Sequence, residues 1–264
     1  MIINKETIAQ LAAVNKRLDL RTLTDYRQPI KIETNISWTA EGSAKVQIGE
    51  TIILAGVKLS IEKPYNDTPD EGGITVNAEL TPLSSSDYEP GPPQIKAVEL
   101  ARVIDRGIRE AKAVDFKKMC ITPGEKAWFL VIDLITLNDA GNLFDAAGLA
   151  ALAALKAARF PIVDKTTWSI DYKHKTDVPL PLMKEPLAVT IYKINGCLMI
   201  DPNAEEEKAL DARLTISSDA NGTISAIQKG GSTPLSISEI SRMIDLAVEK
   251  AGFLRGILNE YFKE

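Results

Sequence analysis

The sequence has few of the residues that build metal sites or disulfide frameworks. Its 264 residues include two cysteines, Cys120 and Cys197, and one histidine, His174. The cysteines do not form a C-x-x-C pair, which argues against a structural zinc site and against a disulfide scaffold. Unpaired cysteines are typical of a reducing compartment, so we expect a cytoplasmic protein.

The sequence also lacks long apolar runs and an excess of positive charge. Residues 1–20 contain no apolar signal core, and no uninterrupted run is long enough to span a bilayer, so we expect no membrane association. The 31 Lys and Arg residues are outnumbered by 36 Asp and Glu residues, which gives a formal net charge of −5. This balance argues against nucleic-acid binding over the whole surface and is compatible with a local basic patch.

The apolar periodicity predicts an α+β protein with two similar halves, each with strands before helices. Helices are predicted near the N-terminus, over 95–114, in the alanine-rich segment before Pro161, and over 237–258. Strands are predicted at 29–38, 44–49, 51–63, 73–80 and 126–137, and then at 168–173, 187–194, 196–201, 212–218 and 222–228. We expect the strand at 126–137 to be buried on both faces, and the last helix to bury a stripe from Ile237 to Leu254.

The second predicted helix carries the sharpest chemical signal. At about 100° per residue, Arg102, Arg106 and Arg109 lie on one narrow face and the apolar residues lie opposite. One interpretation is a solvated face with ion pairs from Glu99 to Arg102 and from Asp105 to Arg109. The other is a phosphate-binding face, because Arg102 and Arg106 repel each other at i, i+4 and planar guanidiniums in a row suit a phosphate backbone.

A group of carboxylates follows the strand predicted at 196–201. Its members are Asp201, Glu205, Glu206, Glu207 and Asp211. Grouped carboxylates can bind Mg²⁺ together with substrate phosphates, or one of them can act as a general acid. The alternative is a solvated turn whose glutamates begin a short helix after Pro202, where acids stabilise the first turn.

The alanine-rich helix begins after a glycine turn within the sequence NDAGNLFDAAGLAALAAL. Free backbone N–H groups and the helix dipole make such a helix start a natural anion site. The sequence therefore raises the possibility that the turn at Gly141 holds a phosphate.

Two segments of the chain resemble the RNase PH family. They read KPYNDTPDEGGITVNAELTPLSSSDYEPGPPQIKAVELARVIDRGIRE and GNLFDAAGLAALAALKAARFP. The resemblance extends from about Arg17 to Lys263, and the EPGPP, ELAR-V-DR and V-DL-LND-GN-FDA motifs occur in the expected order and spacing. Within that family the chain is most similar to the non-catalytic RNase PH-like subunits of the archaeal exosome.

The resemblance implies a fold, partners and an activity. The implied fold is a duplicated βαβα unit of the ribosomal-protein-S5-domain-2-like type, with residues 1–264 as one RNase PH-like domain and halves at about 28–162 and 185–264. The implied partners are a catalytic RNase PH-like sister subunit, which forms a hexameric ring as a trimer of heterodimers, and RNA-binding cap subunits. Such a ring degrades single-stranded RNA from the 3′ end with inorganic phosphate, can use Mg²⁺, and adds 3′ tails in the reverse reaction.

The resemblance also assigns roles to residues. Arg102 and Arg106 match the arginines with which non-catalytic subunits contact RNA, and Arg109 is a weaker match. Lys63 and Tyr65 either line an RNA entrance or end a strand, and the sequence does not decide between these roles.

The expected phosphate grip is missing from the glycine turn. Catalytic members carry Gly-Ser-Arg or Gly-Thr-Arg there, and this chain has Gly141, Asn142 and Leu143, followed by Asp145, whose charge would repel phosphate. We therefore expect no catalytic residue, metal or cofactor in this chain.

The alternative that the sequence leaves open is an active phosphorolytic exoribonuclease subunit. It would use Asp201, Glu205 and Asp211, which keep part of the family's carboxylate motif, although Glu205 stands where Asp is usual and Pro202 replaces an aromatic residue. A small-molecule phosphotransferase would need a glycine-rich nucleotide loop, and neither GNLFDAAG nor KGGST fits a P-loop.

Overall fold

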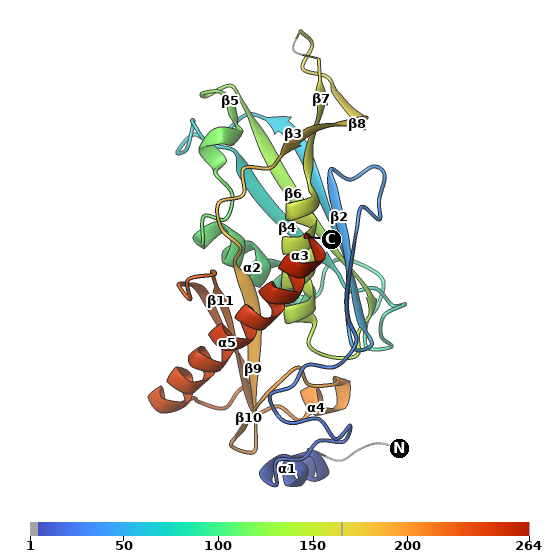
Figure 1. Ribbon diagram of the computed structural model, residues 1–264, viewed down its shortest axis with the longest axis vertical. Helices are drawn as coiled ribbons and strands as arrows, with labels where there is room; N and C mark the ends of the chain where they lie inside the picture. Colours follow the sequence, from blue (N-terminus) through green and yellow to red (C-terminus); the bar gives the residue numbers. More distant parts are fainter. Residues whose placement is uncertain (1–4, 165, 264) are drawn as a thin grey trace.

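The first half of the chain forms a mixed sheet of six strands. The computed structural model describes residues 5–164 and 166–263. The strands are β1 (Ile30–Thr34), β2 (Gly42–Ile48), β3 (Thr51–Glu62), β4 (Gly73–Glu79), β5 (Cys120–Thr122) and β6 (Lys126–Asn138). Their order is β1-β2-β3-β6-β4 with β5 beside β6, and β4 pairs with β6 in parallel while the other pairs are antiparallel (Figure 1).

The second half forms an antiparallel sheet in the order β10-β9-β11-β12. Its strands are β9 (Leu187–Ile194), β10 (Cys197–Ile200), β11 (Ala212–Ser218) and β12 (Ile224–Gly230). A separate two-stranded arm, β7 (Arg159–Val163) with β8 (Ile170–Pro179), links the halves and lies at one end of the molecule (Figure 1).

Helices join the two sheets into one core. They are α1 (Lys5–Ala13), α2 (Ile95–Glu110), η1 (Phe116–Met119), α3 (Leu143–Ala157), α4 (Ala204–Lys208) and α5 (Ile237–Tyr261). The alanine-rich α3 packs against β2 and β3 on one side and β9 on the other, so small side chains allow close approach from both sheets. Helix α2 packs on β4 and reaches β12, whereas α5 packs on β9 and β11.

The predicted α+β class and the predicted strands are confirmed, with differences at particular residues. Strand β6 is buried on one face only: Leu130, Ile132 and Leu134 lie in the core, whereas Val131 and Ile135 stay half-buried. The prediction of two buried faces was wrong because α3 packs on one face of this sheet. Ile237 is also misassigned, since it begins α5 at the surface and is 86 % exposed.

None of the helices in the described part of the chain is long and apolar enough to cross a membrane.

Candidate functional site

Helix α2 buries its apolar face and exposes two arginines. The buried side chains include Leu100, Val103, Ile104 and Ile108. Arg102 and Arg106 lie one turn apart on the opposite, exposed face. Neither forms a hydrogen bond or an ion pair with any residue within 5–164 or 166–263, so both guanidiniums are available to a ligand.

One interpretation of the sequence expected an ion pair between Glu99 and Arg102, and this pair is not formed. The Glu99 carboxylate instead accepts a hydrogen bond from Arg213 of β11, with the two atoms 2.7 Å apart. The Arg213 guanidinium lies 4.5 Å from the centre of the Phe144 ring, and its side chain is only 12 % exposed. A desolvated guanidinium needs a carboxylate more than an exposed one does, which explains why Glu99 pairs with Arg213 and not with Arg102.

Arg109 has a different environment from the other two arginines. It donates to both carboxylate oxygens of Asp105, at 3.1 and 2.7 Å, and to the carbonyl of Ile74 at 2.7 Å. The hydrogen bond to Asp105 raises the pKa of Arg109, although burial opposes this effect. The local ion pair expected from Asp105 to Arg109 is therefore present, and an RNA contact by Arg109 stays a prediction.

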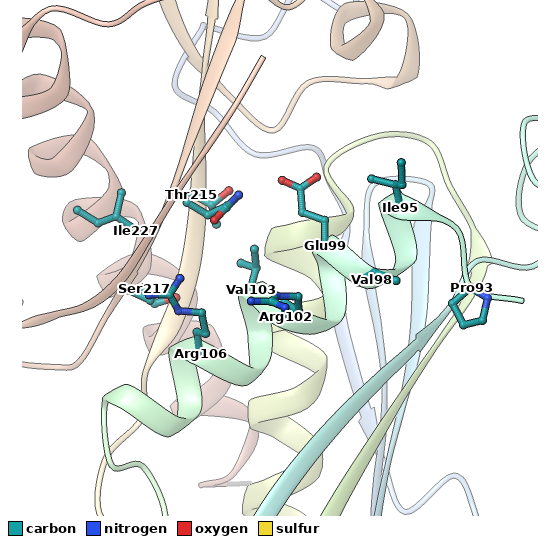
Figure 2. Close-up of a pocket in the computed structure, with 12 residues that line it drawn as sticks. Pro93, Ile95, Val98, Glu99, Arg102, Val103, Arg106, Thr215, Ser217 and Ile227 are labelled. Atoms are coloured by element: carbon teal, nitrogen blue, oxygen red, sulfur yellow. The ribbon is translucent and has the colours of Figure 1, made fainter. Parts of the chain in front are cut away.

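A wedge-shaped cavity of about 610 Å³ separates α2 from the second sheet. We call it the α2–β12 wedge, and its lining is Pro93, Ile95, Val98, Glu99, Arg102, Val103, Arg106, Thr215, Ser217, Ala226, Ile227 and Gln228 (Figure 2). Beside the wedge, α2 and β11 come into close contact at Gly107, where a Cβ would stand 2.7 Å from the Ser217 hydroxyl oxygen. The helix and the sheet therefore touch near Gly107 and diverge toward Ile95 (Figure 2).

Asp201, the first carboxylate of the alternative catalytic set, is fully buried and neutralised inside the protein. It accepts hydrogen bonds from the Arg27 backbone N–H at 2.6 Å and from the Arg27 guanidinium at 3.0 and 2.8 Å. Arg21 and the Asn142 side-chain amide add bonds of 3.3 and 3.0 Å. The carboxylate is thus surrounded by internal donors, and this is the environment of a structural ion pair.

Asp211 and Glu205 have separate partners. Asp211 pairs with Lys5 at 3.2 Å and accepts the Asn195 backbone N–H at 2.7 Å. Glu205 lies in the first turn of α4 and pairs with Lys208 at 3.6 Å. The acidic segment therefore does form a short helix after Pro202, capped by Asn203.

The carboxylates do not assemble into a metal site. Among residues 5–164 and 166–263, no group of three or more His, Cys, Asp or Glu side chains is placed to hold a metal ion. The side chains present therefore do not fit the Mg²⁺ that the family resemblance would allow here.

The glycine turn before α3 already contains an anion of the protein itself. The Asn142 backbone N–H donates to Glu207 at 3.2 Å, and the Tyr192 hydroxyl donates to the same carboxylate at 3.2 Å. Burial, together with the nearby charge of Asp139, raises the pKa of Glu207. The N–H that a phosphate would use is thus occupied by Glu207.

Leu143, Asp139 and Glu207 also line a cavity of about 320 Å³ beside the turn. Its Asp139 carboxylate accepts hydrogen bonds from the Tyr88 hydroxyl and from the Gly141 N–H. Two carboxylates facing this cavity disfavour a phosphate. Gly141 is required by the turn, because its φ is +102° and a Cβ would stand 2.5 Å from the Pro202 carbonyl oxygen.

Asp145 does not face the turn as a repelling charge. It is fully buried in the first turn of α3, where it accepts bonds of 2.8 Å from the Tyr26 hydroxyl and 2.8 Å from the Thr190 backbone N–H. Burial raises its pKa to about 7. Its role in the structure is to connect α3 with β9 and with the segment before β1.

Lys63 and Tyr65 lie in the loop after β3. Tyr65 is 55 % exposed and packs edge-on against Phe129 with ring centres 5.5 Å apart, so it anchors this loop. Lys63 is exposed. A contact of either residue with RNA stays undecided.

Two residues of these sites were missed in the sequence, and the role of a third was missed. Arg27 neutralises Asp201, and Arg213 takes the partner expected for Arg102. Glu207 was named in the acidic segment, but its hydrogen bond to the N–H of the turn was not expected. The one local signal was Gly230, directly opposite Arg213 in the β11–β12 pair, where a Cβ would stand 2.6 Å from the Arg213 guanidinium carbon.

The fold and the site together define a class of protein. Two strand-and-helix halves share the central helix α3, and free arginines on α2 form a surface suited to a chain of phosphates. A family model described as "3′ exoribonuclease family, domain 1" matches residues 27–161, and one described as "3′ exoribonuclease family, domain 2" matches residues 184–250. The chain belongs to this family, the RNase PH family, which confirms the resemblance found in the sequence.

Relatives of nearly the same length carry an exosome name. The "Exosome complex component Rrp42" of Methanosarcina acetivorans is 45 % identical and covers 98 % of this chain and 94 % of its own length. The protein of that name from Pyrococcus horikoshii is 42 % identical over 99 % of this chain and 96 % of its own.

Two solved structures have the same fold. A chain of the Archaeoglobus fulgidus exosome with RNA bound to the active site superposes with a TM-score of 0.88 at 39 % identity and covers 96 % of each chain. A chain of an archaeal exosome core gives a TM-score of 0.84 at 36 % identity and covers 97 % of this chain and 96 % of its own. The chain is therefore a homologue of archaeal exosome core subunits.

Proposed function

We propose that this chain is a non-catalytic ring subunit of an archaeal exosome. In this proposal it pairs with a catalytic RNase PH-like sister subunit, three heterodimers close the ring, and Arg102 and Arg106 grip single-stranded RNA beside the sister's active site. The complete ring degrades RNA from the 3′ end with inorganic phosphate and tails RNA in the reverse direction.

The observation that carries the proposal is that two arginines of α2 have no partner within the described chain and can bind a ligand. Arg102 and Arg106 are exposed and have no ion-pair partner among the described residues. A guanidinium that no carboxylate of its own chain neutralises is free to bind the phosphates of an RNA backbone. The relatives that carry an exosome name, and the solved exosome with RNA in its active site, support RNA as the ligand.

The absence of catalysis in this chain is supported by the chemistry of the turn and of the acidic segment. The turn lacks the hydroxyl and the guanidinium of catalytic members, and Glu207 occupies the Asn142 N–H. Asp201 is held by Arg27 and Arg21 and is therefore not exposed to a substrate. These arrangements do not favour the alternative of an active phosphorolytic subunit.

The remaining partners follow from the same proposal. Inorganic phosphate, and Mg²⁺ where it is used, bind in the sister subunit, because this chain offers neither an open phosphate grip nor a grouped carboxylate site among its described residues. Cap subunits with RNA-binding domains complete the assembly. A cytoplasmic location suits a complex that processes RNA.

A phosphate-dependent RNA degradation assay tests this function. We expect the isolated chain to release no nucleoside diphosphates, and the complex with its sister subunit to release them. Comparable turnover by the isolated chain would contradict a non-catalytic role. A sister subunit that is equally active with and without this chain would contradict its contribution to the site.

A further inference from the structure

Arg102 lies between two carboxylates of its own helix. Glu99 precedes it by three residues, and Asp105 follows it by three residues. Side chains at this spacing are neighbours on a helix surface, so each carboxylate could form an ion pair with Arg102. Glu99 instead accepts a hydrogen bond from Arg213, and Asp105 accepts two from Arg109. Two other arginines therefore hold the carboxylates that would otherwise neutralise Arg102.

The alignment of β11 with α2 brings Arg213 to Glu99. Arg213 and Ser217 lie on the same face of β11, because side chains alternate along a strand. Ser217 meets α2 at Gly107, where the two elements are in close contact. The four residues from Ser217 back to Arg213 span about 13 Å of strand, and the eight from Gly107 back to Glu99 span about 12 Å of helix. The backbone of the fold therefore sets this ion pair.

Packing fixes the Arg213 guanidinium in its place. It lies 4.5 Å from the centre of the Phe144 ring, and a Cβ at Gly230 would stand 2.6 Å from its central carbon. The Arg213 side chain is only 12 % exposed, so its charge is largely desolvated. A desolvated guanidinium without a carboxylate is costly, and Arg213 therefore retains Glu99 as its partner.

Glu99 is also the acidic residue closest in type and place to compete with RNA. Among the described residues that line the α2–β12 wedge, it is the one carboxylate, and Arg102 and Arg106 are the two basic side chains (Figure 2). An unneutralised carboxylate at this position would repel an approaching phosphate and attract Arg102. The Arg213 pair removes both effects.

We propose that Arg213 and Arg109 are positioning residues for RNA binding. They hold Glu99 and Asp105, so that the Arg102 guanidinium stays available for an RNA phosphate. Arg213 acts from inside the protein, and Arg109 acts on the surface of α2, where its role requires no contact with RNA. This inference rests on the proposed function, because it takes Arg102 as a phosphate contact.

A rescue experiment in the assembled ring tests the role of Arg213. Arg213→Met removes the charge and keeps a long side chain, and we expect RNA binding to weaken by about tenfold at low salt. The slope of log K against log salt should decrease by roughly one. Adding Glu99→Gln removes the released carboxylate and should restore the affinity to within about twofold of the unmodified ring. Fluorescence anisotropy with single-stranded RNA measures both quantities, after native mass spectrometry has confirmed the composition of each ring.

Arg109 provides the same test at a more exposed position. Its side chain is 44 % exposed, so Arg109→Met should leave the fold intact and weaken RNA binding, and adding Asp105→Asn should restore it. Arg255→Met is the control for loss of a buried arginine, because Arg255 is 6 % exposed on α5 and donates to the Ser218 carbonyl at 2.8 Å. The control ring should bind RNA with unchanged affinity.

The outcomes separate this inference from the proposed function. Unchanged affinity in Arg213→Met and Arg109→Met would overturn the inference, provided that Arg102→Ala with Arg106→Ala weakens binding. A loss that the carboxylate substitutions do not restore would also overturn it, because the two arginines would then contact RNA directly or act through the fold. If Arg213→Met prevents assembly, the Arg109 and Asp105 variants decide by the same criteria. Unchanged affinity on loss of both Arg102 and Arg106 would instead overturn the proposed function.

Discussion

The exposed face of α2 and the turn at Gly141 both contain several charged side chains. At the turn these charges are paired within the chain, whereas on α2 two of them are not. At the turn, Asp201 is surrounded by Arg27, Arg21 and Asn142, and Glu207 accepts the free N–H of the helix start. On α2, Arg102 and Arg106 have no such partner among the described residues. Charges satisfied within the chain hold the fold together, whereas charges left open are available to a ligand.

The comparison also separates residues that a motif would group. Asp201 and Asp211 share a sequence segment, but Asp201 is completely buried and the Asp211 side chain is 26 % exposed. Arg106 and Arg109 share a helix face, but of these two only Arg109 is paired to a carboxylate of the described residues. Burial and pairing therefore distinguish structural from functional members of each motif.

The largest effect is expected from Asp201→Asn. Removing one partner of a buried ion pair leaves Arg27 uncompensated, and we expect the free energy of unfolding to fall by about 3 to 5 kcal/mol. Asn tolerates the positive φ of 44° at this position, so the loss reports on charge and not on backbone strain. Urea unfolding measures the change.

Asp211→Asn is the matched control for that substitution. Its partly exposed pair with Lys5 predicts a loss of about 1 kcal/mol or less. Equal losses for the two variants would contradict the distinction between a buried and an exposed carboxylate. Normal stability of Asp201→Asn combined with an inactive ring would revive a catalytic role for Asp201.

The next largest effect is expected from Arg102→Ala with Arg106→Ala in the assembled ring. Losing two charge-assisted phosphate contacts should weaken RNA binding by about a hundredfold at low salt. The salt dependence, as the slope of log K against log salt, should decrease by roughly one for each arginine. Fluorescence anisotropy with single-stranded RNAs of different sequence measures both quantities.

Arg242→Ala controls for the loss of an exposed arginine on another helix, α5. It should leave RNA affinity unchanged. A loss confined to particular RNA sequences in the α2 double variant would indicate base recognition instead of phosphate binding, and an unchanged affinity would remove the function proposed for this face.

A smaller effect is expected from Gly141→Ala. The substitution combines a φ of +102° with a Cβ that would stand 2.5 Å from the Pro202 carbonyl oxygen, and we expect a loss of about 2 to 3 kcal/mol in the free energy of unfolding. Gly124→Ala is the control, because Gly124 has a φ of +74° and open space around its Cβ position. The control should lose about 1 kcal/mol. Similar losses for Gly141→Ala and Gly124→Ala would mean that the close approach of α4 is not the reason why position 141 requires glycine.

Much of the fold and part of the site could be predicted from the sequence. The period of α2 predicted correctly which side chains are buried and that Arg102 and Arg106 share an exposed face, because local geometry fixes both. The partner of Glu99 could not be predicted, since Arg213 is 114 residues away and its burial depends on packing against Phe144. The α2–β12 wedge could not be predicted either. It lies where α2 and the second sheet diverge, and the angle between these elements depends on tertiary packing and not on a sequence motif.

The last prediction concerns pH and the internal charge beside the turn. Free Asp titrates near 3.8, and burial raises the pKa of Asp145 to about 7 in the folded chain. Between these pH values the folded state keeps a proton that the unfolded state has lost, so the Asp145 contribution to stability falls as pH rises from about 4 to 7 and is constant above.

Asp145→Asn removes this titration while its side-chain oxygen can still accept the Thr190 N–H. Relative to the unmodified chain, the variant should therefore gain on the order of 1 to 3 kcal/mol of unfolding free energy between pH 5 and pH 8. Urea unfolding of both proteins across this range measures the difference, and a difference that does not vary with pH would show that Asp145 is ionised throughout.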